Sequence, residues 1–600
     1  MKFFREDKNY DYVMYAILII FFLFMLFFSS FRDMIKDESL YFNETWLMSQ
    51  LLQEGKWIGN YAVGLHGFLF KLPMALIFLI TGPSVEIVTI FNILLACITG
   101  LLFYNLSKKV LGKSKYGVLS TLILLSSFYF FISTPTYLRE IPSVFVVVLF
   151  LYSLIDNWDK WKMSLIFLLL LDSKEYIFFV FALFYLILLL IESDKKGVSK
   201  IVEVLKQYVL IMLPSAVWLV LMFTTSIIPM NMYVVSTLGL IDTNFKYLFS
   251  HFNADMATLN LIEGGREMPL IIIKESYSAF AHVIINILNV ILQYIGKVLY
   301  PRTFSFISVP KVVIFPVIYT SILLVKKYLK SKSSSIRKYA HLSLLLLVWL
   351  VIYILRTSHG RYLLPVLPVI SILYIYILFK HRFTKKQKKD MVIGTLIFIV
   401  LGFLFETSYV VPKILIEVGI FVLFAVSIRN PKLKNLKYLL VVLLSGACVG
   451  VSLLFSYTQG QVYGAVNFGK NRQAEQVAKI LPNEKYWTNN DINQMLVSVY
   501  SNERFSEPQW HWQLHDIVPK KEMLKTLDEK RSFVFEVVSI DKFKKNIKRY
   551  NIEKLVLYES KIKEKYTDQE YLTTFMSQDW IELEKKYEFK GLNVYIFNVK

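Results

Sequence analysis

Long apolar runs recur along almost all of the first 455 residues and constrain the fold more than any other feature. The first run, residues 13–31, is long enough to cross a bilayer as a helix. Of the 600 residues, 55% are hydrophobic and 16% are aromatic, more than a soluble protein of this size normally contains. The pattern predicts a multi-pass membrane protein. No A-x-A cleavage site follows the first run, so we expect it to remain as an anchor.

The net charge of +22 does not indicate a nucleic-acid partner, because the basic residues cluster in short loops between the apolar runs. Such loops are typical of the cytoplasmic side of a membrane protein. The strongly basic loops are 326–338, 381–389 and 429–437, and weaker ones are 107–115 and 195–200. All of them should lie on the same side as the N-terminus.

Three runs do not fit a simple span. Run 68–80 has only about 13 residues and contains Lys71 and Pro73, which favours an interfacial or re-entrant helix. Run 279–298 has a polar residue every three or four positions, which favours an amphipathic helix along the outer surface. Run 163–191 is too long for one span and is interrupted at 172–175, so we expect two short helices joined by a polar turn.

These choices predict a mainly α-helical, polytopic membrane protein with about 13 transmembrane helices, a cytoplasmic N-terminus and a C-terminus outside. The predicted spans are 13–31, 86–106, 116–132, 140–155, 163–171, 176–191, 209–228, 304–325, 342–355, 362–379, 391–405, 414–428 and 438–455. The membrane module would cover 1–455, with long outer loops at 32–65 and 229–303. Residues 456–600 should form a small extracytoplasmic α/β domain, with strands at 533–538, 554–558 and 593–599 and helices at 520–530 and 540–550.

Polar residues that break the apolar pattern fall at the predicted outer ends of the spans. A charged group near hydrocarbon costs about 2.5–3.5 kcal/mol, so such groups usually face a cavity and have a function. Single basic residues can instead extend to the interface, as expected for Lys162, and Glu417 inside a late span would form a helix-packing hydrogen bond. The outer group comprises Asp37, Glu38, His66, Lys71, Arg139, Glu140, Asp172, Lys174, Glu175, Arg356, His359, Arg361 and Tyr362.

This mixture of charges has a chemical meaning. Carboxylates can act as a general base or hold a metal, and cationic side chains can stabilise a phosphate leaving group. A cavity that combines both suits a lipid phosphate whose tail stays in the bilayer. No cofactor is certain from the sequence, although the carboxylates could hold a divalent metal.

Four motifs resemble those of the GT-C superfamily of membrane glycosyltransferases, in the branch of protein O-mannosyltransferases and the aminoarabinose transferase of lipid A. Asp37 to Tyr41 is similar to the family's D-E-x-x-Y. His66 to Gly82 is similar to the H/K-P-P-L segment, with Gly67-Phe68 in place of the two prolines. Arg139-Glu140 opens a span where the family more often has Asp. Residues 361–368, RYLLPVLP, match R-Y-L-L-P-x-x-P, and Lys174 matches the Lys of a T-K-G turn.

The resemblance implies transfer of a sugar from a polyprenyl-phosphate carrier to a lipid, glycan or protein acceptor at the outer face of a cell membrane, a transferase of EC class 2.4 in cell-envelope synthesis. Asp37 would be the general base, with Glu38 and Glu140 orienting the acceptor, a basic partner or a metal. Lys174, Arg139, Arg361 and His66 would bind the lipid phosphate. Lys71 and Tyr362 complete the expected substrate-binding set, and the composition is typical of a bacterial protein.

Two other functional classes remain open. A transporter or flippase for a lipid-linked precursor would also need charged groups in the membrane, but the sequence has no internal repeat and its charges favour one face. A non-catalytic partner in envelope assembly is the other, and it would not need Asp37.

Trp510, His511 and Trp512 could stack on sugars or pack in the core of the outer domain. Cys97 and Cys448 both lie inside apolar runs, so no disulfide framework is expected.

Overall fold

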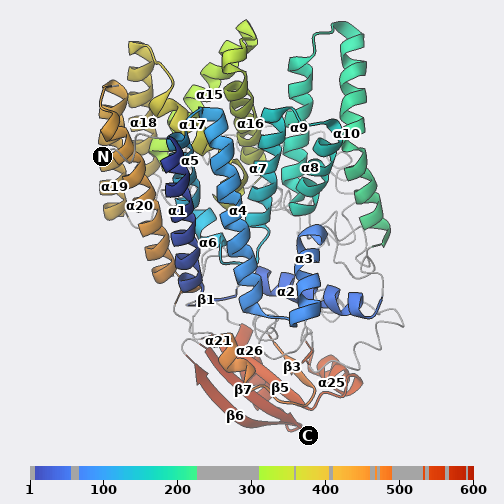
Figure 1. Ribbon diagram of the computed structural model, residues 1–600. Helices are drawn as coiled ribbons and strands as arrows, with labels where there is room; N and C mark the ends of the chain where they lie inside the picture. Colours follow the sequence, from blue (N-terminus) through green and yellow to red (C-terminus); the bar gives the residue numbers. More distant parts are fainter. Residues whose placement is uncertain are drawn as a thin grey trace, which may run out of the picture.

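A computed structural model shows a long helical bundle with a small sheet beyond one of its ends (Figure 1). The structure describes residues 7–30, 32–34, 36–55, 67–225, 310–356, 360–404, 410–430, 432–459, 467–468, 473–489, 532–533, 539–560, 567–589 and 592–600. The predicted amphipathic helix 279–298, the helix 520–530, His66, His359 and the 510–512 group lie outside the described residues.

Most helices of the bundle overlap the predicted spans. In chain order the helices are α1 (Asp7–Ser29), α2 (Lys36–Gln53), α3 (Phe68–Thr81), α4 (Val85–Leu111), α5 (Ser114–Ser126), α6 (Phe128–Ser133), α7 (Glu140–Asp156), α8 (Lys160–Ser173), α9 (Glu175–Glu192), α10 (Gly197–Thr225), α15 (Lys311–Ser331), α16 (Ser334–Arg356), the 3-10 helix η4 (Gly360–Val366), α17 (Leu367–Phe379), α18 (Lys385–Leu404), α19 (Val410–Arg429) and α20 (Lys434–Gln459). However, α2 occupies the predicted outer loop 32–65, and α10 begins 12 residues before the predicted span 209–228.

Among the described residues, five helices are both long and apolar enough to cross a membrane. These segments are Asn9–Ser29, Val85–Leu111, Gly197–Val220, Lys311–Ser331 and Lys434–Leu453. Shorter apolar helices lie between them, such as Tyr176–Glu192 and Leu363–Phe379. The chain is therefore a multi-pass membrane protein, but the predicted count of 13 spans is not confirmed, because several apolar helices are too short to qualify alone.

The surface of the bundle also fits a lipid environment. Ile20 of α1 is 66% exposed, and Val209 and Val220 of α10 are 58% and 60% exposed. Exposed apolar side chains on this scale are costly in water and favourable against hydrocarbon. The interior is packed by a single large apolar cluster that joins α1, α4, α5 and α7 to α15, α17 and α20.

Two interruptions divide long apolar runs. Run 163–191 forms α8 and α9, as predicted, and the break is a single extended residue, Lys174, with φ −160° and ψ 123°. The predicted span 116–132 is instead divided at Ser127, which is also extended. The Ser127 hydroxyl donates to the Leu124 carbonyl at 2.7 Å, a local bond that competes with the helical ladder.

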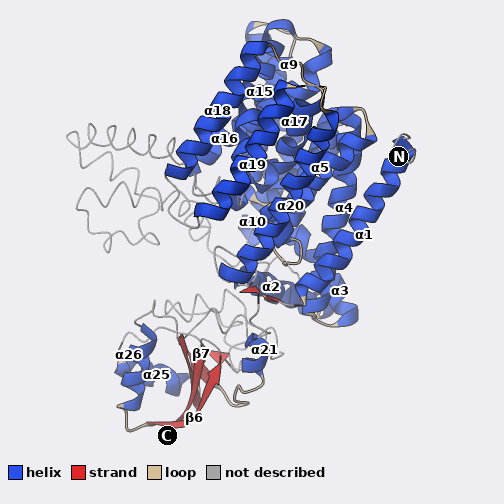
Figure 2. Ribbon diagram, turned by 90° about the vertical axis from the view of Figure 1, so that its left-hand side faces the viewer, coloured by secondary structure: helices blue, strands red, loops and turns tan. Residues whose placement is uncertain are grey.

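The C-terminal sheet has five strands in the order β4-β3-β5-β7-β6. It lies beyond the end of the bundle that carries α2 (Figure 2). They are β3 (Tyr486–Thr488), β4 (Ser532–Phe533), β5 (Lys554–Ser560), β6 (Ile581–Phe589) and β7 (Leu592–Val599). Strand β3 runs parallel to β4 and β5, whereas β7 pairs antiparallel with β5 and β6.

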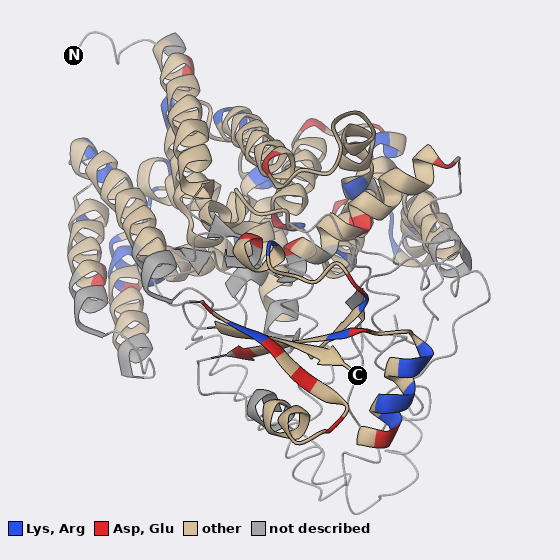
Figure 3. Ribbon diagram, turned by 90° about the horizontal axis from the view of Figure 1, so that it is seen from below, with Lys and Arg blue, Asp and Glu red and all other residues tan. Residues whose placement is uncertain are grey.

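Helices cover both faces of this sheet. Trp487 and Phe597 pack with Phe543 of α25 (Ile540–Arg549) and Phe575 of α26 (Thr567–Met576), and α21 (Gln473–Ala478) packs on the other face. The predicted strands at 554–558 and 593–599 and the helix at 540–550 are confirmed. Charged residues lie along the length of both β6 and α25 (Figure 3). A short antiparallel pair, β1 (Arg32–Asp33) with β2 (Asn467–Phe468), joins the segment after α1 to the segment after α20.

A candidate active site at the α2 end of the bundle

Helix α2 carries the first predicted motif and lies across the end of the bundle nearest the sheet (Figure 1). Asp37 is its second residue, in the first turn, where acidic residues favour the helix dipole. Residues 41–45 of α2 are buried, polar and apolar alike. A helix this polar can be buried only if its side chains find partners, and these partners define the candidate site.

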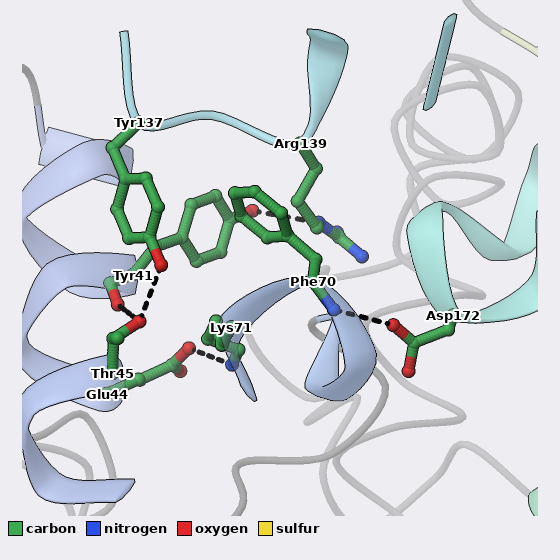
Figure 4. Close-up of polar contacts among 8 residues, drawn as sticks. All are labelled: Tyr41, Glu44, Thr45, Phe70, Lys71, Tyr137, Arg139 and Asp172. Carbon is green, nitrogen blue, oxygen red and sulfur yellow. Dashed lines mark hydrogen bonds and ion pairs between the residues drawn. The ribbon is translucent and has the colours of Figure 1, made fainter. Parts of the chain in front are cut away.

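Glu38 is fully buried and holds α2 against the segment before α7. Its Oε1 accepts a hydrogen bond from the Tyr137 backbone N–H at 2.6 Å. Two helical turns along α2, the Thr45 hydroxyl and the Tyr137 hydroxyl are 2.9 Å apart and share a hydrogen bond (Figure 4). Tyr137 is therefore fixed to α2 through both its backbone and its ring.

Lys71 forms a buried ion pair with Glu44. Its Nζ lies 2.5 Å from Glu44 Oε2, and both side chains are less than 5% exposed (Figure 4). The pair joins α2 to the start of α3. The role predicted for Lys71, substrate binding, stays a prediction. The structure gives Lys71 a carboxylate partner, Glu44, that the sequence did not suggest.

Arg139 lies over Tyr41, the last residue of the first motif. Its Nε donates to the Tyr41 hydroxyl at 3.2 Å, and its guanidinium carbon is 5.6 Å from the ring centroid. Gly67 packs against the same side chain, since a Cβ at that position would lie 3.1 Å from Arg139 Cδ. Gly67 also has φ +77°, which proline cannot adopt. A proline at position 67 would therefore require a different backbone turn.

Lys174 and Glu140 form a second buried ion pair. Lys174 Nζ lies 2.6 Å from Glu140 Oε1, with the side chains 10% and 6% exposed. The break between α8 and α9 frees Lys174 from the helix, so its side chain can reach the first residue of α7. Beside it, Asp172 Oδ2 accepts a hydrogen bond from the Phe70 backbone N–H at 3.3 Å, which connects α8 to α3 (Figure 4).

These contacts bring together four separate segments of the chain. We refer to the set as the α2 network, and it comprises Glu38, Tyr41, Glu44, Thr45, Lys71, Tyr137, Arg139, Glu140, Asp172 and Lys174. Of the remaining predicted residues, Arg361 and Tyr362 lie in η4, which packs against α6, α7 and α16. Within the described part of the chain, no three His, Cys, Asp or Glu side chains gather in a geometry suited to a metal ion.

Five members of the network were not predicted as catalytic or substrate-binding residues: Tyr41, Glu44, Thr45, Tyr137 and Asp172. Glu44 lies six residues after Glu38, in the segment 32–65 that was predicted as an outer loop and that contains helix α2 in the structure. Its pairing with Lys71 connects residues 27 positions apart, and that of Thr45 with Tyr137 connects residues 92 apart. No local pattern predicts such contacts.

The fold and site define a polytopic membrane protein in which short and broken helices gather acidic and basic side chains at one end of the bundle. No protein-family model and no curated protein matches the sequence. The structure matches that of ArnT from Cupriavidus metallidurans in the apo state, with a TM-score of 0.51 and 12% identity over 99% of this chain and 98% of that chain.

A second structure of ArnT from the same organism, bound to undecaprenyl phosphate, aligns over the same shares with a TM-score of 0.43 and 12% identity. The match to the apo structure covers nearly the whole chain. This chain therefore has the fold of ArnT.

Proposed function

We propose that this protein transfers a sugar from a polyprenyl-phosphate carrier to an acceptor hydroxyl at the outer face of the membrane. The observation that carries the proposal is the convergence of four motif-bearing segments in the α2 network, within the fold of ArnT. The first motif lies on α2, the second opens α3, the third opens α7 and Lys174 separates α8 from α9.

In the proposed reaction, Asp37 removes the proton from the acceptor hydroxyl. The oxygen attacks the anomeric carbon of the sugar, the bond from that carbon to the phosphate oxygen breaks, and polyprenyl phosphate leaves with the bonding electrons. The sugar is transferred with inversion. General-base assistance of this kind contributes about 10²–10⁴-fold to a rate.

Cationic residues of the α2 network would hold the leaving phosphate. Arg139 and Lys174 lie on adjoining segments, and Arg361 and His66 are assigned to the same task from the motif resemblance. Because Lys174 is already paired with Glu140, a phosphate would enter a site whose charges are held in position before it binds. Lys71 and Tyr362 would complete the substrate site, and Glu38 and Glu140 would position the groups around Asp37.

The proposal includes the sidedness of the chain. The α2 network and the C-terminal sheet would face outward, with the N-terminus in the cytoplasm of a bacterial cell. The membrane module would cover residues 1–455 and the outer α/β domain residues 456–600. Cysteine labelling tests this arrangement: Lys585→Cys, on the exposed strand β6, should react from outside, whereas Lys332→Cys should react only from inside.

The decisive experiment compares Asp37→Asn with Asp159→Asn. Asp159 precedes α8 at the opposite end of the bundle and is 70% exposed, so it is a matched control. Membranes containing each variant are supplied with polyprenyl-phosphate sugars, and the release of free polyprenyl phosphate is measured. We expect release to fall at least 100-fold in Asp37→Asn and to be unchanged in Asp159→Asn.

Full release by a well-inserted Asp37→Asn protein would contradict the proposed mechanism. The same assay addresses the alternative function, a flippase for a lipid-linked precursor. A flippase would move the intact sugar lipid across vesicles and release no polyprenyl phosphate with any acceptor. The mixed charges at one end of the bundle favour the transferase, since a transport route needs polar groups along its length.

A further inference from the structure

Five lysines gather at the end of the bundle opposite α2. Lys113 and Lys115 lie at the turn between α4 and α5, and Lys380 directly follows α17. Lys338 is in the first part of α16, and Lys437 is in the first turn of α20. The ends of five helices thus bring one kind of charge to one place, although the residues are far apart in the sequence.

These lysines surround three aromatic rings. Phe379 contacts Tyr116 and Tyr438, with ring centroids 5.1 Å and 5.0 Å apart. Lys115 Nζ lies 5.5 Å from the Tyr116 centroid and 5.9 Å from that of Tyr438. Lys437 Nζ lies 5.9 Å from the Phe379 centroid. We call these eight residues the basic-aromatic patch.

Within the described part of the chain, no lysine of the patch has a carboxylate partner. One turn earlier in α4, by contrast, Lys108 pairs with Asp11 and Lys109 pairs with Asp156. The patch lysines lie close enough to affect one another: partial burial and the nearby Lys113 ammonium lower the pKa of Lys380. Charge of one sign gathered in this way attracts a counter-ion.

Capping of helix ends explains only part of the arrangement. Lys437 donates to the Leu378 carbonyl at 2.5 Å, and Lys338 donates to the Lys109 carbonyl at 3.5 Å, so both satisfy the C-terminal ends of helices. Lys113, Lys115 and Lys380 make no such bond within the described residues. Lys380 Nζ lies near the α4–α5 turn, 3.6 Å from where a Cβ on Gly112 would be, and so faces the same space as Lys113.

We propose that the basic-aromatic patch binds the phosphodiester headgroup of an anionic phospholipid. The lysines would hold the phosphate, and the rings would lie at the level of the headgroup, as aromatic residues do at membrane interfaces. The acyl chains have an apolar surface to follow, because Leu439, Val442 and Leu443 of α20 are 46%, 54% and 45% exposed just beyond Tyr438. A free phosphate would use the lysines but not this surface. The proposal does not depend on the proposed transferase activity.

The test uses the full-length protein in an uncharged detergent, with phosphatidylglycerol or phosphatidylcholine added. Bound lipid is counted by native mass spectrometry, and the melting temperature is measured alongside. The double variant Lys113→Gln/Lys380→Gln removes two patch charges that make no helix-capping bond. Its matched control is Lys326→Gln/Lys330→Gln, two exposed lysines near the end of α15.

We expect phosphatidylglycerol to bind the native protein and the control double variant equally, and to raise the melting temperature of both. Each patch lysine removed should weaken this binding about fivefold, with no change for phosphatidylcholine. An unchanged affinity of the Lys113→Gln/Lys380→Gln protein for phosphatidylglycerol would overturn the proposal. An equal rise in melting temperature with inorganic phosphate alone would also overturn it, since the site would then be one for a free anion.

Discussion

The two ends of the bundle use charge in opposite ways. At the α2 end, acidic and basic side chains pair at 2.5–2.6 Å and are almost completely buried, as for Lys71 with Glu44 and Lys174 with Glu140. At the other end, the patch lysines other than the buried Lys437 are exposed or half-buried, and the ion pair of Lys109 with Asp156 leaves the ammonium 52% exposed. One end is a buried network of paired charges, and the other is a group of lysines around aromatic rings.

The difference shows what each end can contribute. A buried pair depends on both partners, because the charge that remains after one is removed cannot reach water. An exposed pair contributes little to stability, because water and salt already screen both charges. The α2 end is therefore built to keep side chains in fixed positions, whereas the opposite end is free to exchange ligands.

The largest expected effect comes from breaking a buried pair. Lys174→Met should lower the free energy of unfolding by about 3–5 kcal/mol, because it leaves the buried Glu140 carboxylate without its cationic partner. Unfolding in mixed detergent micelles, followed by tryptophan fluorescence, measures the change.

The double variant Lys174→Met/Glu140→Leu is the control. Replacing both charges with apolar groups of similar size should recover most of the lost stability, since a buried pair is often little better than a hydrophobic contact. Activity should not recover with it, because Lys174 is proposed to hold the phosphate. A single variant as stable as the native protein would show that Glu140 has access to water, contrary to its 6% exposure.

A smaller effect is expected from Glu38→Ala. This change removes the acceptor of the buried Tyr137 N–H and should cost about 1.5–3 kcal/mol, the range for a hydrogen bond to a charged group. Glu38→Gln keeps a carbonyl oxygen that can accept the same bond. It should therefore lower the free energy of unfolding clearly less than Glu38→Ala in the same assay. Equal losses for the two variants would indicate that the charge of Glu38, and not its bond to Tyr137, supports α2.

The sequence predicted the convergence of Arg139, Glu140 and Lys174 at one end of the bundle, and it predicted the break at Lys174. Both depend on a local rule, that charged residues inside apolar runs mark the ends or interruptions of membrane helices. The division of the predicted span 116–132 at Ser127 was missed, because serines inside an apolar run are usually compatible with a continuous helix.

The C-terminal sheet was also predicted only where the local sequence indicates a strand. Strands β5 and β7 each contain a continuous run of buried, mostly apolar residues, and they were predicted almost to their ends. Strand β6, IELEKKYEF, was missed because it forms one edge of the sheet and most of its side chains face water. Strand β6 forms because it pairs with β7, and the sequence of β6 alone does not indicate this pairing.

The smallest effect is expected at the exposed pair. Lys109→Gln removes an ammonium 2.5 Å from Asp156, yet it should lower the free energy of unfolding by no more than about 1 kcal/mol, because solvent screens both charges. The same assay in high salt should reduce even this difference, whereas the loss caused by Lys174→Met should persist, because salt does not reach the buried pair. If Lys109→Gln proved as destabilising as Lys174→Met, the contrast between the two ends of the bundle would not hold, and the basic end would have to be regarded as a second rigid core.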